Sequence, residues 1–139
     1  MPAGLTNPVL GYAGFCAVKL AGYSLAGWYL SRSYSRPDIG AFRVGATRTL
    51  IGMATGALYF GVWWASGQLV AGPASYLYLA GLLPVRLAEW WLLIWIFYDR
   101  KLAHAAKGWR NVSLGTAWSY LLDAPAIAGL LAAGGFWVC

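Results

Sequence analysis

One stretch, from Tyr76 to Arg100, constrains this chain more than any other: YLYLAGLLPVRLAEWWLLIWIFYDR. It is long and apolar enough to cross a lipid bilayer, which takes about 20 residues of helix. It nevertheless carries Arg86 and Glu89 near its middle. At about 1.5 Å per residue, Arg86 lies roughly 15 Å from Tyr76, near the centre of a hydrocarbon layer about 30 Å thick. A charge at that depth costs about 2.5 to 3.5 kcal/mol, so it needs a partner or a purpose.

The residues next to Arg86 in the sequence include an acidic partner and a proline. Arg86 and Glu89 are three residues apart, so they share a helix face on which they can pair. Pro84 precedes Arg86 by two residues. Because proline has no N–H and its ring displaces the carbonyl of Ala80, we expect a kink beside the charges.

The composition indicates an integral membrane protein. The chain is 60% hydrophobic and 10% charged, whereas soluble domains carry about 25% charged residues. From Thr49 to Val85 it has no Asp, Glu, Lys or Arg. The net charge of +6 could indicate a nucleic-acid partner, but the Lys and Arg residues flank apolar segments, as topology signals do. We therefore expect a lipid bilayer as the surroundings and no nucleic acid.

Four apolar segments predict an all-α, four-helix transmembrane bundle that forms a single domain over residues 1–139. The predicted spans are 9–30, 44–66, 76–98 and 112–137. The loops after the first and third spans hold almost all of the Lys and Arg, whereas both tails and the middle connection hold none. The positive-inside rule makes both basic loops cytoplasmic and gives an N-out/C-out topology. We expect a multi-pass protein of a bacterial inner membrane.

Other predicted spans also carry ionisable residues. Lys19 lies roughly 15 Å into the first span, and Asp123 lies roughly 18 Å from the inner edge of the fourth. Arg48 is only a few residues inside the second span, so its side chain can reach the inner surface. The sequence therefore predicts two cations, Lys19 and Arg86, and two anions, Glu89 and Asp123, at similar depth. Arg48 is expected closer to the inner surface.

Polar residues near these charges recur every three or four positions, which is typical of an inward helix face. The three predicted faces are Tyr12, Cys16, Lys19 and Tyr23; Arg48, Gly52, Thr55 and Tyr59; and Thr116, Ser119, Tyr120 and Asp123. A proline inside a helix leaves one backbone carbonyl without its N–H donor, and such carbonyls recur near midplane charges in transporter sites. Pro84 and Pro125 each lie within two residues of a charged residue. We therefore predict a ligand-binding, ion-binding or charge network of Lys19, Arg86, Glu89, Asp123, Arg48, Tyr23 and Tyr120.

A purely structural interpretation stays open for the same residues. Lys19 with Asp123, and Arg86 with Glu89, are also consistent with permanent ion pairs that fix helix register. Arg48 by itself fits an anchor at the membrane surface. The complete set, with its tyrosines, hydroxyls and prolines, favours a functional cavity.

Several kinds of site are not indicated. The only histidine, His104, lies in a predicted cytoplasmic loop, and Cys16 and Cys139 match no metal or redox spacing. We therefore expect no metal, no cofactor and no catalytic residue. The favoured function is binding or conducting a small ion, a proton or a polar substrate. The alternative is a non-catalytic accessory subunit of a larger membrane complex, and a membrane-embedded enzyme acting on a lipid-like substrate comes third. Expected partners are copies of the chain in a homo-oligomer or other membrane subunits.

Overall fold

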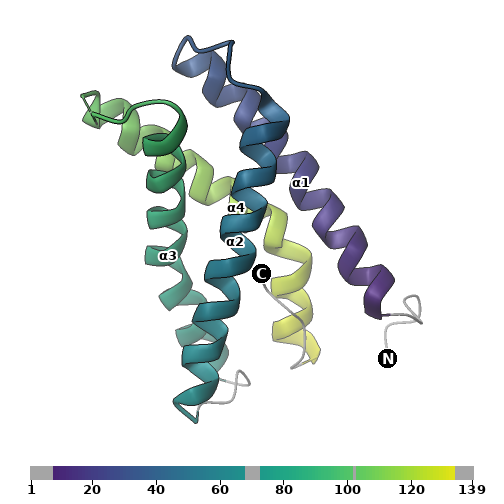
Figure 1. Cartoon of the computed structure of the whole chain (residues 1–139). Helices are drawn as coiled ribbons and strands as arrows, with labels where there is room; N and C mark the ends of the chain where they lie inside the picture. The colour runs from purple at the N-terminus through teal and green to yellow at the C-terminus, as the bar shows by residue number, and fades with distance from the viewer. Residues whose placement is uncertain (1–7, 68–72, 102, 134–139) are drawn as a thin grey trace. The chain divides into compact units, whose positions relative to one another are not determined.

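The computed structural model describes residues 8–67, 73–101 and 103–133. These residues form four helices and no strand, which confirms the predicted all-α class (Figure 1). The helices are α1 (Pro8–Ser33), α2 (Ala41–Ala65), α3 (Pro73–Phe97) and α4 (Ala105–Ala133). The chain divides into two compact units, residues 1–49 and 50–139, so α2 gives its first turns to unit one and the rest to unit two. The single domain over residues 1–139 stays a prediction.

The helix bounds follow the predicted spans except at the start of α4. That helix begins at Ala105, whereas the predicted span begins at residue 112. The apolar run marks where a membrane span begins, but helical hydrogen bonding does not need apolar residues. Lys107 and Arg110 are good helix formers, so the helix extends back through the basic segment. Residues 134–137 of the predicted fourth span lie outside the described residues.

One segment within the described part of the chain, Tyr76–Phe97, is both long and apolar enough to cross a membrane. Length does not set it apart, because α1, α2 and α4 have 26, 25 and 29 residues. Glycines, small polar residues and charges dilute the apolar character of those helices. The structure therefore shows one helix suited to a membrane, and four spans in an N-out/C-out topology stay a prediction.

In unit one, a tight turn ends α1 and starts the return of the chain. The N–H of Arg36 donates to the carbonyl of Ser31 at 2.8 Å, and that of Ser35 donates to Arg32 at 3.2 Å. These two bonds form the Schellman motif, in which the residue after the helix takes a left-handed conformation. Ser35 holds that place with φ 54°, where glycine is the usual residue.

Small residues bring α1 and the start of α2 together in unit one. A Cβ atom added to Gly27 would lie 2.9 Å from the side chain of Val44. One added to Gly45 would lie 2.6 Å from the backbone nitrogen of Ser24. The Ser31 hydroxyl also donates to the carbonyl of Ile39 at 3.1 Å. Small residues at these positions let the two helix backbones approach closely.

In unit two, aromatic rings lie over glycines of the neighbouring helix. A Cβ added to Gly115 of α4 would meet the indole of Trp90 on α3, and one added to Gly108 would lie 2.7 Å from Trp91. These contacts hold α3 and α4 close along their length. Both helices continue through their internal prolines, Pro84 and Pro125.

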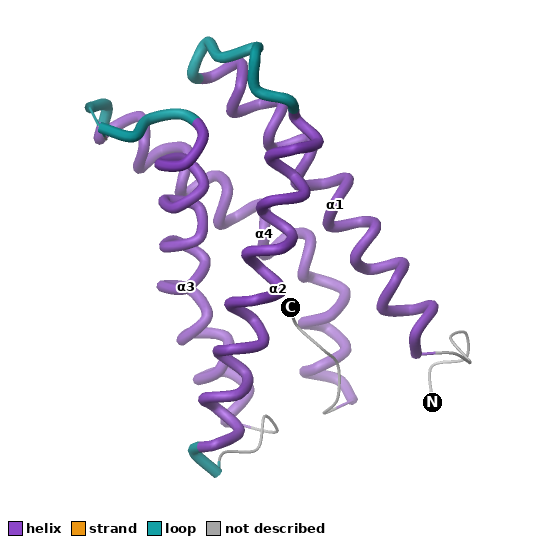
Figure 2. The backbone as a smooth tube through the Cα atoms, in the orientation of Figure 1, coloured by secondary structure: helices purple, strands orange, loops and turns teal. Residues whose placement is uncertain are grey.

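Figure 2 shows the loop that joins α3 to α4. Within this loop, the carboxylate of Asp99 binds the start of the next helix. That carboxylate accepts the N–H of Ala103 at 3.2 Å and that of His104 at 3.1 Å, and His104 Nδ1 lies 3.6 Å from it. Desolvation tends to raise the pKa of Asp99, but the two N–H donors and His104 outweigh it and lower that pKa. The loop thus holds an ionised carboxylate near the start of α4, where negative charge is favourable.

Candidate functional site

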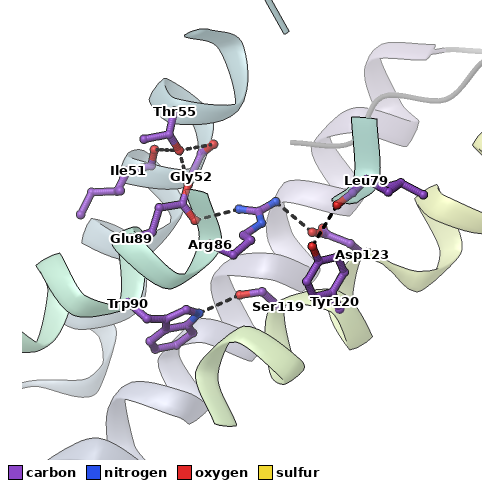
Figure 3. A network of polar contacts seen from close by, with 10 residues as sticks. All are labelled: Ile51, Gly52, Thr55, Leu79, Arg86, Glu89, Trp90, Ser119, Tyr120 and Asp123. Carbon is purple, nitrogen blue, oxygen red and sulfur yellow. Dashed lines mark hydrogen bonds and ion pairs between the residues drawn. The ribbon is translucent and has the colours of Figure 1, made fainter. Parts of the chain in front are cut away.

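Arg86 of α3 lies between two carboxylates in unit two (Figure 3). Its Nη1 is 3.1 Å from Glu89 Oε2, one helical turn further along α3. Its Nη2 is 2.9 Å from Asp123 Oδ2 on α4. The exposed fractions are 1% for Arg86, 3% for Glu89 and 0% for Asp123, so all three groups are removed from solvent. We call these residues the Arg86 network.

The geometry follows from the residue types. A guanidinium is planar, carries donors on separate nitrogens and does not lose its charge in proteins. It can therefore contact a carboxylate on each side, which a lysine ammonium does less well. The spacing of three residues brings Glu89 to one edge of Arg86, and the packing of α4 on α3 brings Asp123 to the other.

A hydroxyl from α2 completes the surroundings of Glu89. Thr55 Oγ1 is hydrogen-bonded to Glu89 Oε1 and also lies 2.8 Å from the carbonyl oxygen of Ile51. The carbonyl oxygen of Gly52 is farther away, at 3.4 Å. The hydroxyl thus stands between a backbone carbonyl, which only accepts, and a carboxyl group, which accepts or donates according to its protonation.

Further polar contacts fix α3 between its neighbours in unit two. The Trp90 indole N–H donates to Ser119 Oγ of α4 at 3.0 Å. Tyr120 of α4 donates its hydroxyl to the carbonyl of Leu79 at 3.2 Å, and Tyr59 of α2 donates to that of Tyr78 at 2.9 Å. Both carbonyls come just before Ala80, whose carbonyl Pro84 leaves without its helical donor, so tyrosines from two helices contact the backbone of α3 close to the predicted kink.

The seven predicted site residues fall into both units. Unit two brings Arg86, Glu89, Asp123 and Tyr120 together, and the pair expected from the spacing of Arg86 and Glu89 is present. The other three, Lys19, Tyr23 and Arg48, belong to unit one.

Unit one holds its two buried cations against aromatic rings. Arg48 lies over the ring of Tyr23, with its guanidinium carbon 4.7 Å from the ring centroid. Lys19 Nζ lies 4.7 Å from the centroid of Phe15. The face of an aromatic ring attracts a cation. The predicted pair of Lys19 with Asp123 joins residues of different units and stays a prediction.

Sequence reasoning missed two parts of this arrangement. It did not pair Asp123 with Arg86, although both were placed near the same depth. It also left Trp90 without an assigned role, whereas the structure buries it against α4. A signal for Trp90 was available, because it lies four residues after Arg86 and therefore shares its helix face.

The chemistry open to the Arg86 network is that of charge and hydrogen bonding. Over the described ranges, no group of three or more His, Cys, Asp and Glu residues is placed to hold a metal ion. Two ionised carboxylates that share one guanidinium leave one negative charge in excess, which a proton or a further cation could balance. Searches of protein families, curated proteins and solved structures find no match to this chain.

Proposed function

We propose that this chain is a four-span membrane protein whose Arg86 network binds or conducts a small ion, a proton or a small polar substrate. One observation carries the proposal: a single buried guanidinium is shared by two buried carboxylates on neighbouring helices. One ion pair between the two helices, such as Arg86 with Asp123, would be enough to fix the register of α3 against α4. The second carboxylate, Glu89, is on α3 itself, so its pair with Arg86 adds a desolvation cost without fixing α3 against α4, and this favours a functional use of the site.

The distribution of side chains supports a membrane environment for the helices. Five charged side chains of the helices, those of Lys19, Arg48, Arg86, Glu89 and Asp123, are buried, while large apolar side chains are exposed on every helix; buried charges and exposed large apolar side chains are both uncommon in soluble domains. The exposed apolar residues include Val18, Leu25, Leu50, Leu58, Val62, Leu83, Leu92, Leu114 and Leu121. At about 1.5 Å per residue, 25 residues extend roughly 37 Å, enough for a hydrocarbon layer of about 30 Å.

The test is flux through liposomes that contain the purified protein. A pH-sensitive dye inside the vesicles reports proton movement, and imposed Na⁺ or K⁺ gradients test the two common cations. We expect Glu89→Gln to lose most of the flux per folded molecule, because it removes the charge and keeps the shape. Asp38→Asn is the matched control, since it makes the same kind of change in an exposed loop. Full flux in Glu89→Gln would make Glu89 part of the scaffold.

The proposed topology has its own test. The basic loops should face the cytoplasm, whereas the charge-free segments should face outward. Reporters fused at Lys107 and after Cys139 should therefore report opposite sides of the membrane. A cytoplasmic signal from both positions would contradict the N-out/C-out arrangement.

The alternative function is an accessory subunit of a larger membrane complex. The observation in its favour is the exposure of aromatic side chains, such as Trp64 and Trp95, which pack as readily on another membrane protein as on lipid. Purification in mild detergent separates the two proposals. An accessory subunit should co-purify with defined other chains, whereas a transporter or channel should appear alone or as a homo-oligomer.

A further inference from the structure

Thr55 has one hydroxyl hydrogen and two close acceptors. The first is the carbonyl of Ile51, which a threonine inside a helix commonly bonds. The second is Oε1 of Glu89. If the hydroxyl hydrogen points to Glu89, Oε1 of the carboxyl group is the acceptor, which is the arrangement that an ionised carboxylate requires. If it points to Ile51, the contact with Glu89 is a hydrogen bond only when the carboxyl group itself carries a proton and donates it.

From this geometry we infer that Glu89 is the proton-binding residue of the Arg86 network, with Thr55 as the partner that satisfies both of its protonation states. Rotation of one hydroxyl changes Thr55 from donor to acceptor toward Glu89, and no heavy atom has to move. In the protonated state, Glu89 donates to Thr55, which donates to the Ile51 carbonyl. A buried carboxyl group that is hydrogen-bonded in both states avoids the cost of an unsatisfied polar atom in either one.

The charge balance of the network agrees with this assignment. Arg86 keeps its charge, so it forms a neutral pair with Asp123 when Glu89 carries a proton. When Glu89 loses the proton, the three groups together carry one negative charge, which attracts a proton or another cation. The rotation of the Thr55 hydroxyl does not involve the ion pair of Arg86 with Asp123, so Asp123 remains the counter-ion of Arg86 in both states.

The other groups around Glu89 set the background of its titration. From α3 and α4 it faces Arg86 and Asp123, and Tyr120 lies within electrostatic range of both. From α2 it faces Thr55, which belongs to the same unit. The inference rests on the proposed function, because it makes the proton the ligand of that site.

The chain offers a direct test, because Glu89 is its only glutamate. Glutamate made heavy at the side-chain carboxyl carbon therefore labels one carboxyl group in the otherwise unchanged protein. Infrared spectra of the labelled protein in lipid nanodiscs, recorded over a range of pH, should show the carbonyl stretch of a protonated acid. That band should shift with the isotope and decline as the pH rises.

Three variants make the test specific to the geometry. Asp123→Asn should keep the isotope-sensitive band. Thr55→Val should move the band to higher frequency, because the acid loses its hydrogen-bond acceptor, and Thr55→Ser should restore the original position. A spectrum without an isotope-sensitive acid band at any pH at which the protein is folded would overturn the inference. The inference would also be overturned by an acid band that does not shift with the isotope and is absent in Asp123→Asn.

The two proposals can fail separately. If Glu89 is ionised at every pH while flux still depends on it, the site binds a cation or a polar substrate and only the proton assignment falls. If the labelled acid band is present but Glu89→Gln transports normally, Glu89 binds a proton without taking part in transport. The second result would leave the inference standing and remove the proposed function.

Discussion

Removing the guanidinium of Arg86 is the sharpest perturbation that the structure offers. Arg86→Met keeps much of the volume of the side chain and takes away the cation from both Glu89 and Asp123. Each of these carboxylates is almost completely buried, and each is within 3.1 Å of the guanidinium. The variant therefore has two buried carboxyl groups near one another without the cation between them.

The expected loss follows from this burial. Breaking a buried ion pair on one side costs about 3 to 5 kcal/mol. At about 1.4 kcal/mol for each factor of ten, the ratio of folded to unfolded protein should fall roughly 10²- to 10⁴-fold. Arg86→Lys should lose less, because it keeps the charge but lacks the planar fork that reaches two carboxylates. The triple variant Arg86→Met, Glu89→Gln, Asp123→Asn should recover most of the loss, since it leaves no buried charge in the network.

Unfolding of the purified protein in mixed detergent micelles, followed by circular dichroism, measures these differences. The matched control is Arg36→Met, which removes an arginine from the exposed pair with Asp38. That pair has side chains 48% and 62% exposed, so its loss should have little effect. The reasoning is refuted if Arg86→Met is no less stable than Arg36→Met, or if the triple variant is less stable than Arg86→Met alone.

Three further predictions concern the scaffold. Gly115→Ala should cost about 1 to 3 kcal/mol in the same assay because its Cβ would meet the Trp90 ring, whereas Gly61→Ala, whose Cβ meets no described atom within 4 Å, should not destabilise. Ser35→Gly should gain about 1 kcal/mol, since glycine adopts the positive φ at that position without strain; a loss of stability would contradict the assigned turn. Because the pKa of Asp99 is lowered in the folded protein, its stabilisation should be present above pH 3.8 and lost as the pH falls through the lower folded value. Asp99→Asn should therefore be less stable than the original protein at neutral pH, and the difference should shrink in acid.

Much of the helical architecture follows from local patterns. Apolar runs and turn residues place four helices, and a spacing of three residues is enough to predict the Arg86–Glu89 pair. Both are local properties, which depend on residues close together in sequence. Helix α4 begins before the predicted fourth span, because hydropathy marks a membrane boundary and does not mark the end of a helix.

The tertiary part of the site could not be read in the same way. Depth along a helix groups Lys19, Arg86 and Asp123 at one level but does not say which of them meet. The contact of Arg86 with Asp123 depends on how α4 is rotated about its axis against α3, and the packing of Trp90 on Gly115 helps to set that rotation. The contact of Thr55 with Glu89 likewise needs the register of α2 against α3. Helical periodicity gives the polar face of each helix and leaves these registers open.

Access of water-soluble molecules to Thr55 tests most directly whether the Arg86 network is a site or a sealed support. Thr55→Cys, in a chain with Cys16 and Cys139 replaced by alanine, is treated in membrane vesicles with a charged thiol reagent that does not cross lipid. Ser35→Cys, in an exposed loop, gives the rate for full access, and Leu58→Cys, 70% exposed on an apolar surface, gives the rate for a thiol that faces lipid. The proposed function predicts that Thr55→Cys reacts clearly faster than Leu58→Cys. If Thr55→Cys reacts no faster than Leu58→Cys from either side of the membrane, the network is sealed, and the accessory-subunit proposal explains the protein better.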